Sequence, residues 1–296
     1  MKGTDRRRAA ALLVCIGALH VAGLAAVLAG AVGAGLALTA YTLGLRHAFD
    51  ADHIAAIDGT TRRLSGDGRR APLSIGFFFA AGHSTVVFAV AALVVLGLGA
   101  IADDAALQTV TGVIGPSVSG TFLLVVAALN IALLRSGTGG GGGLLTRVYG
   151  RATRSVHRPW HMYPLGFLFG LGFDTAGEIA LLVLAAGLGP SGLWLPLAFA
   201  AGMTLLDTAD GALMGRAYGW ALRRPARRRY VNVVLTALSA GVALLVGTVE
   251  LAGLVWPPAA GIDLNAIGLA VVALFALTFA LAAAAWRIGR LEERWS

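Results

Sequence analysis

The segment RHAFDADHIAAID, Arg46–Asp58, places six strongly polar side chains inside one of the most apolar stretches of the chain. A charged side chain at the centre of a bilayer costs about 2.5–3.5 kcal/mol on insertion scales, so such residues mark functional sites. The surrounding sequence predicts a membrane: of 296 residues, 57% are hydrophobic and 13% are charged, with a mean hydropathy of +0.80. A soluble domain carries about 25% charged residues. The sequence therefore predicts an all-α polytopic membrane protein.

Eight segments are long and apolar enough to cross a bilayer, which takes about 20 residues. The second is included in spite of its charges, and the segments are 9–31, 34–58, 73–100, 108–134, 162–188, 193–221, 231–256 and 264–286. The first begins like a signal peptide, but its apolar run exceeds the roughly 7–15 residues of such a peptide, so we expect a retained helix. A glycine-rich cytoplasmic loop, 135–161, is expected to join helices 1–4 (9–134) to helices 5–8 (162–286). These two four-helix halves would form one transporter domain over residues 1–296.

The basic residues predict the orientation of these helices. All of the 23 lysines and arginines except Arg46 and Arg216 lie at the termini or in alternate loops. By the positive-inside rule, both termini and those loops are cytoplasmic, as in a multi-pass protein of a prokaryotic cytoplasmic membrane. The partner that the composition implies is the lipid bilayer, and the scattered basic clusters argue against nucleic acid despite a net charge of +8.

Two further sequence features exclude other classes of protein. The single cysteine, Cys15, allows no intramolecular disulfide and excludes a thiol–disulfide carrier, which needs a cysteine pair. The glycine run Gly139–Gly143 lacks the GK[ST] ending and the strand–helix context of a phosphate-binding loop.

The opening segment is a candidate metal site. On an ideal helix over 34–58, one wide face holds five of its polar residues: Arg46, His47, Asp50, His53 and Asp58. Imidazoles with carboxylates suit nickel, cobalt, copper or zinc better than magnesium or calcium. The alternative is an Arg46–Asp50 ion pair, with the histidines bonded to neighbouring helices. Asp52 points about 100° away from His53 on such a helix, so either the helix is distorted or Asp52 serves another helix.

Other predicted helices carry their own polar residues. Asp174 and Glu178 are four residues apart, and Asp207 and Asp210 are three apart, so each pair shares a helix face. Two carboxylates at this spacing repel each other in an apolar medium unless a cation or a proton lies between them. His83 is a candidate ligand, proton relay or packing residue. His20 joins the candidates because the short first loop must pack helix 1 against helix 2.

These motifs together resemble the nickel/cobalt transporter family. The family signature on its second helix is similar to RHAFDADHI, with His47, Asp52 and His53. Three further family patterns resemble AGHSTVVF around His83, LGFDTAGE with Asp174 and Glu178, and GMTLLDTADG with Asp207 and Asp210. Two positions depart from the family pattern: Gly177 stands for a threonine and Ala81 for a leucine.

The resemblance implies an eight-helix secondary permease, not an enzyme, that imports Ni²⁺ and possibly Co²⁺ as cargo and holds no permanent cofactor. It implies metal ligation by His47, Asp52 and His53, completed or gated by His83 and His20. The residues expected to line the pathway are Arg46, Asp50, Asp58, Asp174, Glu178, Asp207 and Asp210. A related branch exports these metals and has a histidine-rich loop, so the glycine-rich loop favours import.

Two other classes of membrane protein compete with this interpretation. An intramembrane aspartyl protease would use Asp174 and Asp210, but the GxGD pattern is absent, as is the HExxH pattern of zinc proteases. A transporter of another substrate, such as an anion, would need intramembrane arginines, of which the acidic helices offer few.

Overall fold

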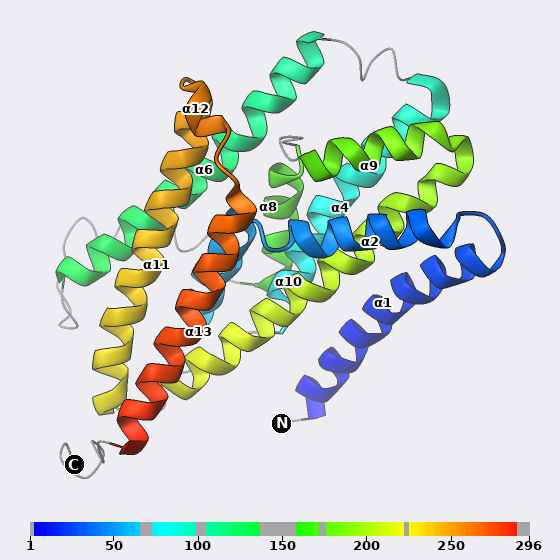
Figure 1. Cartoon of the computed structure of the whole chain (residues 1–296). Helices are drawn as coiled ribbons and strands as arrows, with labels where there is room; N and C mark the ends of the chain where they lie inside the picture. The colour runs from blue at the N-terminus through cyan, green and yellow to red at the C-terminus, as the bar shows by residue number, and fades with distance from the viewer. Residues whose placement is uncertain are drawn as a thin grey trace. The chain divides into compact units, whose positions relative to one another are not determined.

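The computed structural model describes residues 3–65, 73–98, 105–136, 158–171, 176–221 and 225–288. Throughout these ranges the regular structure is helical, without a strand. The helices are α1 (Gly3–Leu28), α2 (Ala34–His47), α3 (Ala51–Ser65), α4 (Ile75–Leu93), α6 (Ala105–Ser136), α8 (Met162–Phe169), α9 (Ala176–Gly187), α10 (Trp194–Ala221), α11 (Pro225–Gly253), α12 (Pro257–Ala260) and α13 (Leu264–Ile288) (Figure 1). A π-helical turn, η1 (Val94–Leu98), extends α4, and 3₁₀ turns precede α8 (η2, Pro159–His161) and α10 (η3, Gly189–Leu193).

Most of the expected spans correspond to single helices. The first, third, fourth, sixth, seventh and eighth overlap α1, α4, α6, α10, α11 and α13, with boundaries that differ by up to seven residues. The fifth falls on α8 and α9, and residues 172–175 between them, which include Asp174, lie outside the described residues.

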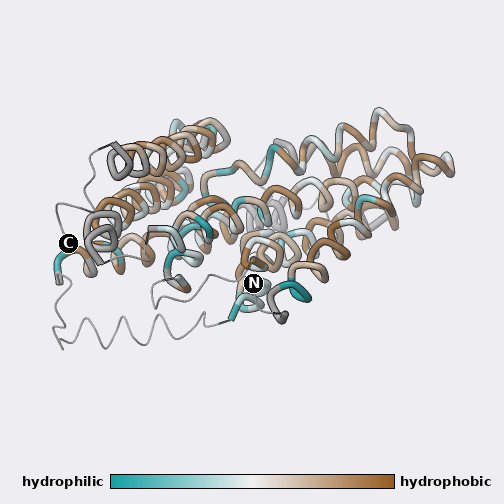
Figure 2. The backbone as a smooth tube through the Cα atoms, turned by 90° about the horizontal axis from the view of Figure 1, so that it is seen from below, coloured by the Kyte–Doolittle hydropathy of each residue, from teal (hydrophilic) through white to brown (hydrophobic). Residues whose placement is uncertain are grey.

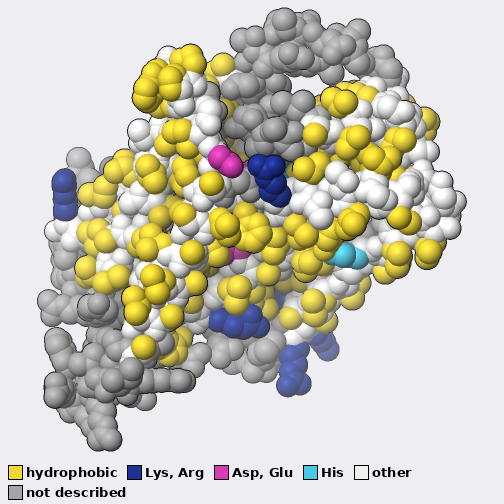
Figure 3. All heavy atoms as spheres, in the orientation of Figure 1, with side chains coloured by type: hydrophobic (Ala, Val, Ile, Leu, Met, Phe, Trp, Pro, Cys, Tyr) yellow, Lys and Arg dark blue, Asp and Glu magenta, His cyan; other side chains and the backbone are white. Residues whose placement is uncertain are grey.

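Four of the described helical stretches are long and apolar enough to cross a membrane: Arg6–Leu28, Ile75–Leu96, Gly189–Trp220 and Val233–Gly253. Apolar colouring runs along most of the backbone (Figure 2). On the face seen in Figure 3, hydrophobic side chains cover much of the described surface and charged ones are few. On α1 and α13 the exposed large apolar residues are Leu13, Val14, Val21, Leu24, Leu28, Leu269, Leu274, Leu277 and Leu281. Soluble monomers rarely expose such surfaces, so the chain is an all-helical membrane protein whose apolar faces suit lipid.

The expected continuous helix over 34–58 is wrong. α2 ends at His47 and α3 begins at Ala51, so residues 48–50 interrupt the helix inside the opening segment. The charges fit two helix ends, because Arg46 and His47 lie in the last turn of α2 and Asp52 lies in the first turn of α3. Basic groups are stabilised at a helix C-terminus and acidic groups at an N-terminus. The helical face expected for one straight helix over 34–58 therefore does not continue past the break.

Asp52 satisfies a backbone group at the start of α3. Its Oδ1 accepts a hydrogen bond from the backbone N–H of His53 at 2.8 Å. The first N–H groups of a helix have no intrahelical acceptor, and a side-chain carboxylate can accept a hydrogen bond from one of them instead. The backbone is interrupted just before Asp52, which is the local distortion that one of the two explanations for this residue assumes.

The described chain forms two compact units, each assembled from three segments. The first unit is Met1–Ala48, Leu73–Ser119 and Arg158–Asp210, and the second is Phe49–Pro72, Gly120–His157 and Gly211–Ser296. Each unit takes segments from both sides of the glycine-rich stretch, so the units do not coincide with the expected four-helix halves. A boundary between units falls in the break that separates α2 from α3.

In the first unit, glycines allow α4 and α8 to lie in close contact. An ideal Cβ on Gly82 of α4 would lie 2.0 Å from the carbonyl oxygen of Tyr163, and one on Gly166 of α8 would lie 2.0 Å from that of Phe79. Figure 1 shows the two helices beside each other, in agreement with their extensive contact. This approach fixes the position of α4 next to His83.

In the second unit, α3 packs against α11 and α13. Buried apolar residues from several helices form its core, including Ile54 of α3, Leu123 of α6, Val246 of α11 and Phe275 of α13. Gly268 of α13 approaches the carbonyl of Phe49 so closely that an ideal Cβ would lie 1.7 Å from the oxygen. The backbone just before α3 is thereby held against α13.

One prediction follows from the α4–α8 contact. Gly82→Ala is expected to lower the free energy of unfolding by about 1–3 kcal/mol, because the added methyl meets backbone that cannot move aside. Thermal unfolding of the purified protein in detergent measures the change. The control is Gly23→Ala in α1, where the new Cβ meets nothing within 4 Å and helix propensity favours alanine. Equal melting temperatures for the two variants would contradict the close contact.

Candidate metal centre

Three polar side chains of the first unit, each from a different helix, lie next to one another. His47 is the last residue of α2, His83 lies in the middle of α4, and Glu178 lies in the first turn of α9. Their exposed fractions are 6%, 2% and 0%, so all are buried. Burial of polar groups is costly unless each finds a partner.

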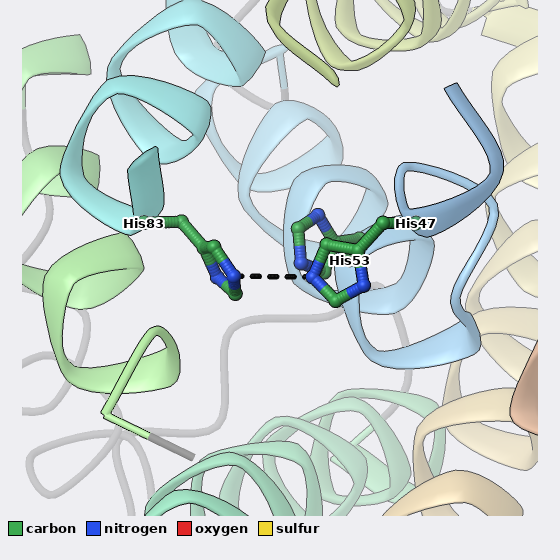
Figure 4. A group of neighbouring side chains, drawn as sticks. All are labelled: His47, His53 and His83. Carbon is green, nitrogen blue, oxygen red and sulfur yellow. Dashed lines mark hydrogen bonds between the residues drawn. The ribbon is translucent and has the colours of Figure 1, made fainter. Parts of the chain in front are cut away.

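The reactive atoms of these side chains form a small triangle. His47 Nε2 lies 3.1 Å from His83 Nε2, the interaction marked by the dashed line in Figure 4. Glu178 Oε1 lies 2.8 Å from His83 Nε2 and 3.6 Å from His47 Nε2. The circle through the three atoms has a radius of about 1.9 Å, so a point just off their plane lies about 2.0–2.1 Å from each, the length of a metal–imidazole bond.

The triangle has the chemistry of a site for a borderline divalent cation. A neutral imidazole carries one N–H, so in the His47–His83 contact one Nε2 donates and the other accepts, and the tautomers decide which. The nitrogen lone pairs and the Glu178 carboxylate are the groups that can act as metal ligands. Nitrogen ligands with one carboxylate suit nickel, cobalt, copper and zinc, whereas magnesium and calcium take oxygen. His47 also lies at the negative end of the α2 dipole, which favours a bound cation.

Packing fixes the orientation of the two imidazoles. Their ring centroids are 4.8 Å apart, and the ring of Phe199 on α10 lies 5.6 Å from that of His47. One turn before His47, an ideal Cβ on Gly44 would lie 2.0 Å from the Phe199 carbonyl oxygen, so α2 and this part of α10 are in backbone contact. Phe199 and Gly44 carry no sequence signal of a site, and only the structure identifies them.

Glu178 is the residue whose position differs most from its predicted role. The sequence assigned it to the pathway together with Asp174, whereas the structure places its carboxylate in direct contact with His83. Residues 83 and 178 are far apart in the chain, and no spacing rule relates them. Asp174 lies outside the described residues.

His53 and Asp52 belong to α3, in the second unit. His53 is fully buried, and its imidazole is a ligand of the same kind as those of His47 and His83. Asp52 is half-buried and caps the start of α3 through the His53 N–H.

The other polar residues of the opening segment have different surroundings. Arg46 is exposed, whereas Asp50 is buried. Asp58 is buried in the second unit, where it accepts hydrogen bonds from the hydroxyl groups of Tyr218 and Ser239.

His20 has its own partners on α1 and α2. Its Nδ1 lies 2.8 Å from the carbonyl oxygen of Ile16, and its Nε2 lies 3.3 Å from the hydroxyl of Tyr41. Tyr41 precedes His47 by six residues, about 9 Å along the axis of α2. The structure therefore does not bring His20 to the triangle.

The acidic residues of α10 lie at the end of the first unit. Asp207 is buried and Asp210 is half-buried. An ideal Cβ on Gly76 of α4 would lie 1.8 Å from the carbonyl oxygen of Asp207, so α4 and α10 are in close backbone contact at this point.

Comparison with known proteins is consistent with this chemistry. The sequence profile of the family described as high-affinity nickel-transport protein matches residues 33–140 and 138–285. The nickel transporter NicT of Mycobacterium tuberculosis is 52% identical over 90% of this chain and 82% of its own length. The nickel transporter NixA of Staphylococcus aureus is 41% identical over 88% of each chain, and the cobalt transport protein NhlF of Rhodococcus rhodochrous is 41% identical over 93% of this chain and 91% of its own. No solved structure matches.

Removing the charge at the triangle tests its role. Glu178→Gln keeps the size of the side chain but removes its negative charge, so the affinity for Ni²⁺ is expected to fall about 10-fold or more. Titration calorimetry on the purified protein measures the dissociation constant. Asp263→Asn, which changes an exposed loop carboxylate in the same way, is the control and is expected to leave it unchanged. The same dissociation constant for Glu178→Gln and the unmodified chain would contradict a site at this carboxylate.

Proposed function

The chain belongs to the high-affinity nickel-transport family, and we propose that it is a permease that imports Ni²⁺, with Co²⁺ as a possible second cargo, across the cytoplasmic membrane. The relatives named for nickel support the first cargo, and the relative named for cobalt supports the second. The proposal assigns the chain no catalytic reaction and no resident cofactor, because the metal ion is the substrate.

The observation on which this proposal depends is the triangle of His47, His83 and Glu178. Its atoms are spaced for bonds of about 2.0–2.1 Å to one ion. The site is buried among apolar residues, as the substrate site of a transporter within a bilayer is expected to be.

We assign His53 to the same ion. It follows His47 by six residues, on the other side of the break between α2 and α3. Discontinuous helices form the ion sites of many transporters, because the exposed ends of half-helices supply charge and backbone ligands. Asp52 supports this assignment from the first turn of α3, where its carboxylate holds the His53 N–H. His20 acts as a ligand only in a conformation in which its contact with Tyr41 is broken.

The remaining acids supply a negative pathway for a dication. Asp50, Asp174, Asp207 and Asp210 are assigned this role, and Arg46 limits the excess of negative charge.

We also propose eight spans with both termini in the cytoplasm, in which α2 and α3 form one interrupted span and α8 and α9 belong to another. The supporting feature is the distribution of basic residues over alternate loops. Arg62 is not part of this loop charge, because Arg62 lies within α3 and its guanidinium donates hydrogen bonds to Thr236 and Asn130.

The membrane potential provides the driving force. When a dication crosses toward a negative interior, its electrical free energy falls by about 4.6 kcal/mol per 100 mV, twice the value for a single charge. Export by the related branch would use the same site, so the direction is measured with proteoliposomes of known orientation and imposed potential.

Uptake of radioactive nickel tests the ligands. His47→Ala and His83→Ala are each expected to reduce initial uptake at submicromolar Ni²⁺ at least about 10-fold, because each removes one bond to the ion. Asp52→Ala is expected to have a smaller effect, since Asp52 acts through the backbone of His53. Protein amounts in the membrane are matched by immunoblot. Full uptake by both histidine variants would exclude the proposed site.

The pH dependence of uptake provides a further test. Neutral imidazole binds a metal and imidazolium does not, so protons compete with nickel for the histidine ligands as the pH falls. At constant potential, initial uptake is expected to fall several-fold between about pH 7.5 and about pH 5.5, and saturating Ni²⁺ is expected to restore much of it. Uptake that rises or stays constant as the pH falls would contradict imidazole ligation.

A further inference from the structure

We propose that a buried hydrogen-bond network in the second unit, made by Asp58, Arg62, Asn130, Tyr218, Thr236 and Ser239, positions α3 and thereby the metal-binding imidazole of His53. This inference rests on the proposed function, since it assigns to these residues the orientation of a metal ligand. We call this set the α3 network.

The α3 network begins at a carboxylate with two donors. Asp58 is 2% exposed, and its Oδ1 accepts a hydrogen bond from the hydroxyl of Tyr218 on α10. Its Oδ2 accepts one from the hydroxyl of Ser239 on α11, at 2.5 Å. Each oxygen therefore has its own helix partner, which restricts α3 from two directions.

One turn further along α3, Arg62 makes a second pair of bonds. Its guanidinium donates to the hydroxyl of Thr236 on α11 at 2.5 Å and to the side-chain oxygen of Asn130 on α6. Asp58 and Arg62 are four residues apart, so they lie on the same face of α3, and their opposite charges partly compensate each other. α3 is therefore bonded to α6, α10 and α11 over two successive turns.

The bonded face of α3 is not the face of His53. Five residues separate His53 from Asp58, which corresponds to about 140° around a helix. The hydrogen bonds of the α3 network are thus made on a different side of α3 from the His53 imidazole. A rotation of α3 by about 10° would move an atom 6 Å from its axis by about 1 Å, and a metal site tolerates only about 0.5 Å.

Apolar packing alone does not fix this rotation. The face of α3 that packs in the core of the second unit is formed by small or aliphatic residues, among them Ala51, Ile54 and Ala55, whose contacts are not directional. Hydrogen bonds have narrow preferred angles, so the bonds to Asp58 and Arg62 select one rotation among several that bury the same surface. Buried polar groups contribute little net stability, and their effect is greater on which arrangement is adopted.

Removing single hydroxyl groups tests the inference. Tyr218→Phe deletes the donor to Asp58 and keeps the ring, which packs edge-on against Phe279. Ser239→Ala deletes the other donor, and Ser239→Thr keeps it. The expected result is a 5- to 20-fold rise in the Ni²⁺ dissociation constant for the first two variants, with recovery in Ser239→Thr, on the order of the effects seen for residues that orient metal ligands.

Matched controls remove hydroxyl groups that the α3 network does not use. Tyr163→Phe deletes an exposed hydroxyl that pairs with Thr85 in the first unit, and Thr278→Ala deletes a hydroxyl that bonds its own helix in α13. Both are expected to leave the dissociation constant unchanged. Hydrogen exchange provides a readout without metal: amide protection of α3 is expected to fall in Tyr218→Phe and Ser239→Ala, with α4 unchanged.

A double-mutant cycle separates positioning from general stability. If Tyr218 acts through His53, then Tyr218→Phe has no further effect on nickel affinity once His53→Ala is present. Additive effects, or unchanged α3 exchange in both single variants, would overturn the inference. If one variant fails to fold, the other completes the cycle. Failure of the proposed function gives a different result, since His47→Ala and His83→Ala would then leave nickel binding intact while α3 exchange still responded to Tyr218→Phe.

Discussion

A helix that stops inside an apolar medium leaves backbone N–H and carbonyl groups that no water satisfies, and this constraint organises the site. α2 ends at His47 and α3 begins at Ala51, so one predicted span contains two helix ends. Basic residues close the first helix, and the carboxylate of Asp52 takes a backbone N–H of the second. Side chains next to the break therefore supply part of the hydrogen bonding that a continuous helix would have provided.

The sequence predicted the class of protein and most of the helices, and it singled out the residues that make up the candidate metal site. It did so because apolar runs, basic loops and isolated imidazoles are local signals that need no knowledge of contacts. The position of the break between α2 and α3 was not predicted, because the mismatch at Asp52 pointed to a distortion without locating it. The order of charges from Arg46 to Asp52 is nevertheless the order that a C-terminus followed by an N-terminus favours. That order is the signal that could have identified the break.

Other positions could not have been predicted from local patterns. The contact of Glu178 with His83 joins residues that are remote in the chain. Arg62 was expected in a loop, but it lies in α3 and donates hydrogen bonds to side chains of two other helices. His20 was grouped with the metal ligands because its helix adjoins the second, yet its ring nitrogens lie on Ile16 and Tyr41. Tertiary geometry decides each of these cases, and residue type alone does not.

The single cysteine of the chain, Cys15, is exposed on α1 among apolar residues. One conservative replacement there yields a thiol-free protein, since no disulfide or second cysteine has to be preserved. Thiols introduced one at a time into α3 or α9 can then carry spin labels or fluorophores without background. The same exposure makes the natural thiol a reporter of what surrounds α1, since reagents that partition into lipid reach it differently from those confined to water.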